Sequence, residues 1–226
     1  MHTLLALYEH PAGVTVGPGN RVVYDLAADT AGFGAATVAG PAVRWEVAVP
    51  AEDVDHEMRH DSDDLDPLQS ELVTVADTSP GRDGESGGDP GGRSGEVASG
   101  VVLEVSVELD GAQEWLMRCD RVDFPPGAVA YRHVHPGPGI RRLLFGELTV
   151  TTGGVTTTHR AGDPWFESGP EPVYAESSVT EPTAFVRVML LPAVWAGRRT
   201  IRYTDPADAD RPARQRATVF LEEPLR

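Results

Sequence analysis

Cysteine is almost absent from this sequence of 226 residues, since Cys119 is its only cysteine. One cysteine excludes an intrachain disulfide and any metal cluster that is held by several thiolates. Cys119 lies in the segment WLMRCDRV, which reads as a strand. We therefore expect it to be a small buried apolar residue.

Basic residues are also scarce: 19 lysines and arginines stand against 35 acidic residues, which gives a formal charge of −16. A surface that binds nucleic acid needs clustered positive charge, and an anionic membrane attracts the same charge. The composition argues against both partners. We interpret the acidic surplus as a property that keeps the surface soluble.

Long apolar runs are missing as well. No stretch approaches the roughly 18 apolar residues that a membrane span requires, and residues 1–13 lack the basic start and apolar run of a signal peptide. A cytoplasmic protein is therefore expected. The 24 glycines and 19 prolines favour turns and short strands over long helices.

Residues 1–78 are predicted to form a β-rich extension whose strands could join a barrel that follows. Residues 43–50 alternate apolar with other side chains, as a half-buried strand does. Residues 13–20 read as a loop. Further strands are expected at residues 21–26, 36–40 and 72–75.

Two polar segments follow in the chain. Residues 52–66 are strongly acidic and include His56 and His60, which would share one face of a helix and could bind a metal there. A solvated, charge-rich segment is the interpretation we prefer. Residues 79–100 carry eight glycines, two prolines and no aromatic residue, so we predict a disordered linker or a long mobile loop.

Residues 101–226 are predicted to form a barrel with a C-terminal tail. Residues 101–109 alternate in polarity, and Asp110-Gly111 predicts a hairpin turn into a partner strand at residues 112–124. Short strands then recur every 8 to 12 residues with turn residues between them, as in an all-β sandwich or barrel. The tail from Trp195 onward contains one strand-like run, residues 217–222, and is expected to pack over the barrel or against a second subunit.

The most informative stretch is residues 125–150, which hold His133 and His135 on a predicted strand. Side chains alternate across a strand, so these two imidazoles can point at one metal ion. Tyr131 has the same parity and could donate a proton or a hydrogen bond. Simple core packing is the plainer interpretation of Tyr131.

The glycines around this histidine pair follow a known spacing. Gly127 is followed by five residues, His133-Val134-His135, three residues, Gly139, six residues and Gly146. This pattern resembles the first motif of the cupin superfamily, except that Gly139 stands where the motif has glutamate. The second motif begins at residues 162–163, with Ser168 and Val173 where proline and histidine are usual. The resemblance covers about residues 101–192.

The resemblance implies an all-β fold, the cupin double-stranded β-helix or jelly-roll barrel. In many cupins three histidines and a glutamate hold a divalent metal such as Fe, Mn, Ni or Zn. This sequence has two of these ligands, and Glu167 is the candidate third, because two histidines and one carboxylate form a facial triad. Alternatively, Glu167 faces solvent or pairs with an arginine. Small cupins often dimerise through strand exchange, so a homodimer is expected.

Other side chains of the same strands are candidates for the site. Arg141 lies two residues from Gly139 and should point inward, where an arginine requires an anion such as Glu167 or a substrate carboxylate. Arg142 should then point outward. Trp165 shares the parity of Glu167, and His159 is expected to be exposed.

These residues allow three hypotheses of function. The first is a metal-dependent cupin enzyme acting on a small organic anion, with Arg141 orienting the substrate and Glu167 or Tyr131 handling protons. Oxygenase, lyase and isomerase chemistry are all compatible with it, because the fold does not choose a reaction. The second is a metal-free cupin that binds a small ligand or a protein partner. In the third, the acidic segment and the linker recruit partners.

Overall fold

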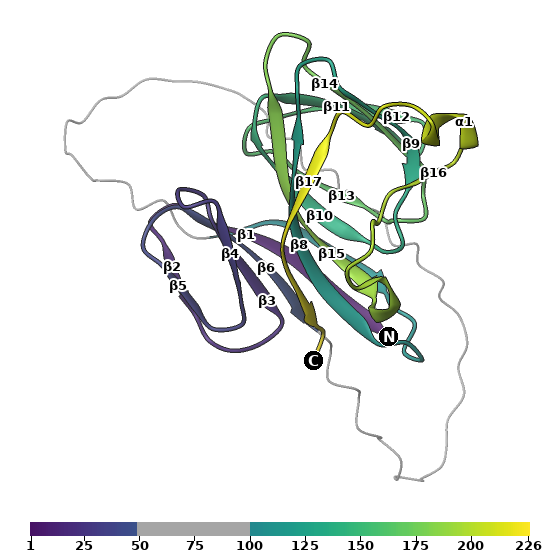
Figure 1. Ribbon diagram of the computed structural model, residues 1–226. Helices are drawn as coiled ribbons and strands as arrows, with labels where there is room; N and C mark the ends of the chain where they lie inside the picture. Colours follow the sequence, from purple (N-terminus) through teal and green to yellow (C-terminus); the bar gives the residue numbers. More distant parts are fainter. Residues whose placement is uncertain (49–99) are drawn as a thin grey trace, which may run out of the picture. The chain divides into compact units, whose positions relative to one another are not determined.

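The computed structural model describes residues 1–48 and 100–226, and Figure 1 shows their strands. The helices among these residues are the short η1 (Ala193–Trp195) and α1 (Pro206–Ala209). No helix of this described part is long and apolar enough to cross a membrane. The predictions for residues 52–66, with His56 and His60, for residues 72–75 and for the linker up to residue 99 lie outside the described residues.

Five antiparallel strands form an N-terminal sheet in the order β4-β3-β6-β1-β7. Their bounds are β1 His2–His10, β3 Arg21–Asp25, β4 Thr30–Phe33, β6 Ala42–Ala48 and β7 Gly100–Glu108. A small ribbon pairs β2 (Val14–Val16) with β5 (Ala36–Val38). The prediction of a loop over residues 13–20 is therefore wrong in part, because Val14 to Val16 find a partner strand.

The predicted hairpin around Asp110-Gly111 is also wrong. Strand β7 pairs with β1, so that Leu5 lies opposite Val105. Both edges of β8 (Trp115–Phe124) are occupied by β15 (Thr183–Pro192) and β17 (Arg216–Pro224). None of the strands in residues 1–48 joins a barrel sheet. Instead, β7 joins the N-terminal sheet.

Two further sheets of five antiparallel strands form the barrel. The first barrel sheet has the order β13-β10-β15-β8-β17, and the second has the order β12-β11-β14-β9-β16. The remaining bounds are β9 Val129–Val134, β10 Gly139–Phe145, β11 Glu147–Thr152, β12 Val155–Arg160, β13 Pro164–Glu167, β14 Val173–Ser177 and β16 Arg202–Tyr203.

The chain crosses from one barrel sheet to the other at almost every connection. It runs from β8 in the first sheet to β9 in the second, back to β10, on to the β11–β12 hairpin, and then through β13, β14 and β15 in alternation. This alternation defines a double-stranded β-helix, so the predicted all-β cupin fold is confirmed. The strand predicted at residues 217–222 is confirmed as part of β17.

The central strands β8, β10 and β15 of the first barrel sheet are mostly buried on both faces. On its outer face, Cys119 and Val188 share an apolar cluster with Leu5 and Trp45 of the N-terminal sheet, and the indole Nε1 of Trp45 donates a hydrogen bond to the carbonyl of Ile140 at 3.1 Å. Cys119 is fully buried, as predicted. Strand β15 is buried along nearly its whole length, so its side chains are shielded from solvent on both faces of the sheet.

The barrel interior is divided into an apolar half and a charged half. Along the inner face of β8, Arg118 and Asp120 come first and Val122 and Phe124 follow. The apolar half is the cluster that contains Phe124. The charged half is defined here as the buried side chains Arg118, Asp120, His133, His135, Arg141, Glu167 and Arg187.

Candidate functional site

The two histidines lie together at the end of β9. His133 and His135 are both buried, and their ring centroids are 4.9 Å apart. Nδ1 of His133 lies 2.7 Å from the carbonyl oxygen of Tyr131, and Nδ1 of His135 lies 3.3 Å from that of Thr200. Because a carbonyl only accepts, each Nδ1 carries the hydrogen, and each neutral ring keeps a lone pair on Nε2.

Burial favours the neutral form of both rings. It is the main cause that lowers the pKa of His135 well below its usual value, and the positive charges of Arg187 and Arg141 act in the same direction. Burial also lowers the pKa of His133, against the opposing effects of its hydrogen bond to Tyr131 and of Glu167. The charged half therefore contains two neutral imidazoles beside its charged side chains.

Glu167 is paired with an arginine inside the barrel. Its Oε2 lies 2.6 Å from Nη2 of Arg141, and its Oε1 accepts a hydrogen bond from the indole Nε1 of Trp165 at 2.9 Å. Burial lowers the pKa of Arg141 to about 10 although Glu167 opposes this shift, so the guanidinium stays charged at neutral pH. Of the two anions expected for Arg141, the structure supplies Glu167.

The structure also explains the glycine that replaces the motif glutamate. A Cβ atom at Gly139 would lie 2.5 Å from the carbonyl oxygen of Val188 and 2.9 Å from Cγ of Met189. No side chain fits there without a shift of β15. The carboxylate of Glu167, on the neighbouring strand β13, is instead the one that lies near the histidines, with Oε2 4.0 Å from Nε2 of His135.

The charged half also contains three residues that the sequence analysis did not single out. Arg187 contacts Asp120 twice, with Nε to Oδ1 at 2.6 Å and Nη2 to Oδ2 at 3.3 Å, and its Nη1 lies 3.2 Å from Nε2 of His135. Arg118 donates to the same Asp120 from Nε at 3.1 Å. One fully buried carboxylate thus holds two guanidinium groups. The available signal was a charged residue inside an otherwise apolar strand, as in TAFVRVMLLP.

Tyr131 is not brought to this cluster. On β14 the residues opposite His133 and Ala130 are two positions apart, Val173 and Ala175, so β9 carries one extra residue between them. This β-bulge breaks the alternation that would have placed Tyr131 beside His133. The Tyr131 ring instead lies under the guanidinium of Arg211, with 4.4 Å between the guanidinium carbon and the ring centroid.

Trp165 lies in the barrel interior beside Glu167, as predicted, and His159 packs against it. The His159 ring stacks on Trp165 with 4.5 Å between the ring centroids, and it is half-buried rather than exposed. The expectation of an exposed His159 is therefore wrong, because its register partner Leu148 is a buried interior residue. Arg142 points away from this site and pairs with Glu9 at 2.6 Å.

As arranged here, the cluster does not fit a divalent metal ion. The Nε2 lone pair of His135 faces Arg187, and Glu167 is paired with Arg141. A metal held by these groups would lie beside two buried guanidinium charges. Within residues 1–48 and 100–226, no group of three or more His, Cys, Asp or Glu side chains has the geometry to hold a metal ion.

The charged half opens onto a small cavity, called the inner cavity below. It measures about 120 Å³, room for about four water molecules, and it is lined by His135, Arg187, Arg118, Arg199 and Gln215 together with apolar side chains such as Phe185. Its size suits a small organic molecule.

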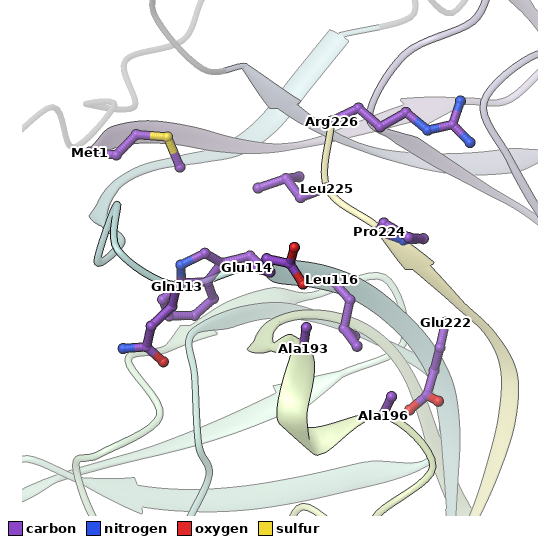
Figure 2. A pocket seen from close by; sticks show the side chains of 11 residues that line it. Met1, Gln113, Glu114, Leu116, Ala193, Ala196, Glu222, Pro224, Leu225 and Arg226 are labelled. Carbon is purple, nitrogen blue, oxygen red and sulfur yellow. The ribbon is translucent and has the colours of Figure 1, made fainter.

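A larger cavity of about 680 Å³ lies elsewhere in the protein. Figure 2 shows side chains around it from the start of β8, from η1 and from the end of β17, including Leu116, Ala193 and Leu225. Neither histidine of the site lines it, and nor does Arg187. Of these two cavities, the inner cavity is the one that His135 and Arg187 of the charged half line.

Comparisons with known proteins found similar solved structures. These include an RmlC-like cupin from Shewanella frigidimarina (23% identity, TM-score 0.31, 34% of this chain and 67% of that chain). A predicted oxalate decarboxylase from Thermotoga maritima has 27% identity and a TM-score of 0.29, with 32% and 64% of the two chains covered. A DMSP lyase from Ruegeria pomeroyi has 21% identity and a TM-score of 0.34, with 40% and 44% covered.

The last two matches span less than two thirds of the similar protein's own length. No family model and no curated protein matches this chain. At these TM-scores the likeness is partial, and the cupin fold of this protein rests on its own sheet order and strand connections.

Proposed function

We propose that the barrel binds a small organic anion in the inner cavity and that Arg187 holds it. The supporting observation is the hydrogen bonding of Arg187, which is only 6% exposed and lines the cavity. Three of its five N–H groups are directed at Asp120 and His135 among the described residues. One N–H on Nη1 and one on Nη2 remain, and we propose that these two bind a carboxylate as a pair.

This assignment gives Arg187 the role that the sequence analysis predicted for Arg141. Arg141 is fully buried, already faces Glu167, and does not line the inner cavity. Glu167 and Asp120 then have related tasks, since each carboxylate compensates the charge of an interior arginine. The catalytic roles predicted for Arg141, Tyr131 and Glu167 are not part of this proposal.

The proposal is tested by titrating small carboxylates, such as acetate and propionate, into the protein by calorimetry. Arg187→Lys keeps the positive charge but loses the planar donor pair, so we expect carboxylate binding to weaken about tenfold or more. Arg142→Lys is the matched control, because Arg142 pairs with Glu9 outside the cavity. The proposal fails if the wild-type protein binds none of these anions or if Arg187→Lys binds them equally well.

The alternative is the metal-dependent enzyme predicted from the sequence, and the close approach of His133 and His135 favours it. Metal analysis after expression with Fe, Mn, Ni and Zn separates the two hypotheses. We expect far less than one metal ion per chain. A near-stoichiometric metal that is lost in His133→Ala/His135→Ala would contradict the arrangement in which Arg187 faces His135.

A further inference from the structure

A third cavity, called the vestibule here, adjoins the inner cavity. It measures about 560 Å³, and four arginines line it: Arg118, Arg198, Arg199 and Arg216. Arg118, Arg199, Gln215 and Ala217 line both cavities. The inner cavity and the vestibule therefore share a wall.

The vestibule is strongly positive in a protein that is strongly negative. The chain has no lysine, so all 19 of its basic residues are arginines. The one carboxylate that lines the vestibule, Glu222, accepts from Arg118 at 3.2 Å and from the backbone N–H of Gly197 at 2.7 Å. Within the described part of the chain, Arg198 and Arg216 take part in no ion pair.

Unpaired positive charge at this place has a cost that a ligand can relieve. Neighbouring guanidinium groups repel one another, and this repulsion is partly screened because Arg198, Arg199 and Arg216 are exposed to solvent. A negative group in the vestibule would offset this repulsion. Such a group would be separated from an anion held by Arg187 only by the side chains that line both cavities.

We infer that the ligand is a small dicarboxylate, with one carboxylate bound by Arg187 and the other by Arg198 and Arg216. This inference rests on the proposed function and narrows its ligand class. The inner cavity, at about 120 Å³, holds one carboxylate with a short carbon chain. The proposed second carboxylate would then have to reach past the side chains that line both cavities and enter the vestibule.

A simpler role for the vestibule would be electrostatic attraction alone. A positive rim raises the capture rate of every anion and does not select for a second carboxylate at a fixed place. The two roles differ in one measurable quantity, which is the ratio of the Kd values of a monocarboxylate and a dicarboxylate of similar length.

The test compares propionate with succinate by calorimetry at low ionic strength. We expect the wild-type protein to bind succinate about tenfold more tightly than propionate. In Arg198→Ala/Arg216→Ala that preference should fall to about twofold or less, while the Kd of propionate changes little because Arg187 is untouched. The preference should also weaken with added salt, since the vestibule is open to solvent.

The matched control is Arg160→Ala/Arg202→Ala, which removes the same net charge at two exposed arginines that line neither cavity. It should retain the preference for succinate. Equal affinities for propionate and succinate in the wild type, or a preference that survives in Arg198→Ala/Arg216→Ala, would overturn the inference and leave the Arg187 proposal standing. Failure of both anions to bind would overturn the proposed function itself.

Discussion

The N-terminal sheet and the charged half of the barrel bury opposite kinds of side chain. The N-terminal sheet contributes Leu5, Leu7, Val43 and Trp45 to an apolar cluster. The charged half buries three arginines, two carboxylates and two histidines. Apolar burial stabilises at about 25 cal/mol per Å², whereas buried ion pairs roughly balance their own desolvation. A gain in stability explains why the N-terminal sheet buries apolar side chains, but it does not explain why the charged half buries charges. We therefore place the proposed ligand at the charged half.

The largest effect that we expect comes from Asp120→Ala. Asp120 is fully buried and holds both Arg187 and Arg118. Its loss leaves two buried guanidinium groups without their shared carboxylate, so the free energy of unfolding should fall by about 3–5 kcal/mol. Urea denaturation measures this change. Asp123→Ala, on the same strand but with its side chain 40% exposed, should cost less than about 1 kcal/mol.

A charge-free replacement of the same three residues sharpens the comparison. In Arg118→Met/Asp120→Leu/Arg187→Met no buried charge is left uncompensated within the trio. We expect stability within about 1 kcal/mol of the wild type, or above it, together with complete loss of carboxylate binding. A large loss of stability in this triple variant would mean that the charged half is needed for folding and would erase the contrast with the N-terminal sheet.

The difference between the two regions also explains how far the sequence could be interpreted. The barrel was predictable because apolar alternation and the spacing of Gly127, Gly139 and Gly146 follow the backbone directly. The pairing of β7 with β1 was not, because it joins residues about 100 positions apart in a way that no local pattern encodes. The alternation of apolar and polar residues in β1 and β7 is equally compatible with pairing to other strands.

Within the site, alternation placed His133 beside His135 and Trp165 beside Glu167. It failed at Tyr131, because the bulge in β9 shifts the parity by one residue and leaves no mark in the sequence. Arg187 and Asp120 were missed for another reason. A charged residue in an apolar strand shows only that something must compensate it, and its partners come from strands far away in the chain.

The next prediction concerns the N-terminal sheet. Trp45 is fully buried and donates from its indole Nε1 to the carbonyl of Ile140 in the barrel. Trp45→Phe removes this hydrogen bond and leaves a cavity, so we expect a loss of about 2 kcal/mol in the free energy of unfolding. The Kd for carboxylates should stay within about twofold of the wild-type value. A large change in that Kd would show that the N-terminal sheet helps to shape the site.

The smallest effect concerns His10, a polar exception in the N-terminal sheet. Its ring is buried, its Nε2 has no hydrogen-bond partner among the described residues, and Tyr8 stacks beside it. Burial chiefly, and the charge of Arg44 in addition, lowers the pKa of His10 in the folded state. Well above the ordinary histidine pKa of about 6.5 the residue is neutral whether the chain is folded or not, so it adds no pH dependence there.

Below that pH the unfolded chain takes up a proton at His10 that the folded protein resists. Stability should therefore fall as the pH drops through about 6.5 towards the lowered pKa of the folded state. In His10→Phe the loss of thermal stability between pH 7.5 and pH 5.5 should be smaller by roughly 1–2 °C. His2→Phe, at a histidine that is 75% exposed, is the control and should behave as the wild type does. If both variants keep the full pH dependence, the acid sensitivity belongs to the charged half, and the N-terminal sheet contributes apolar packing only.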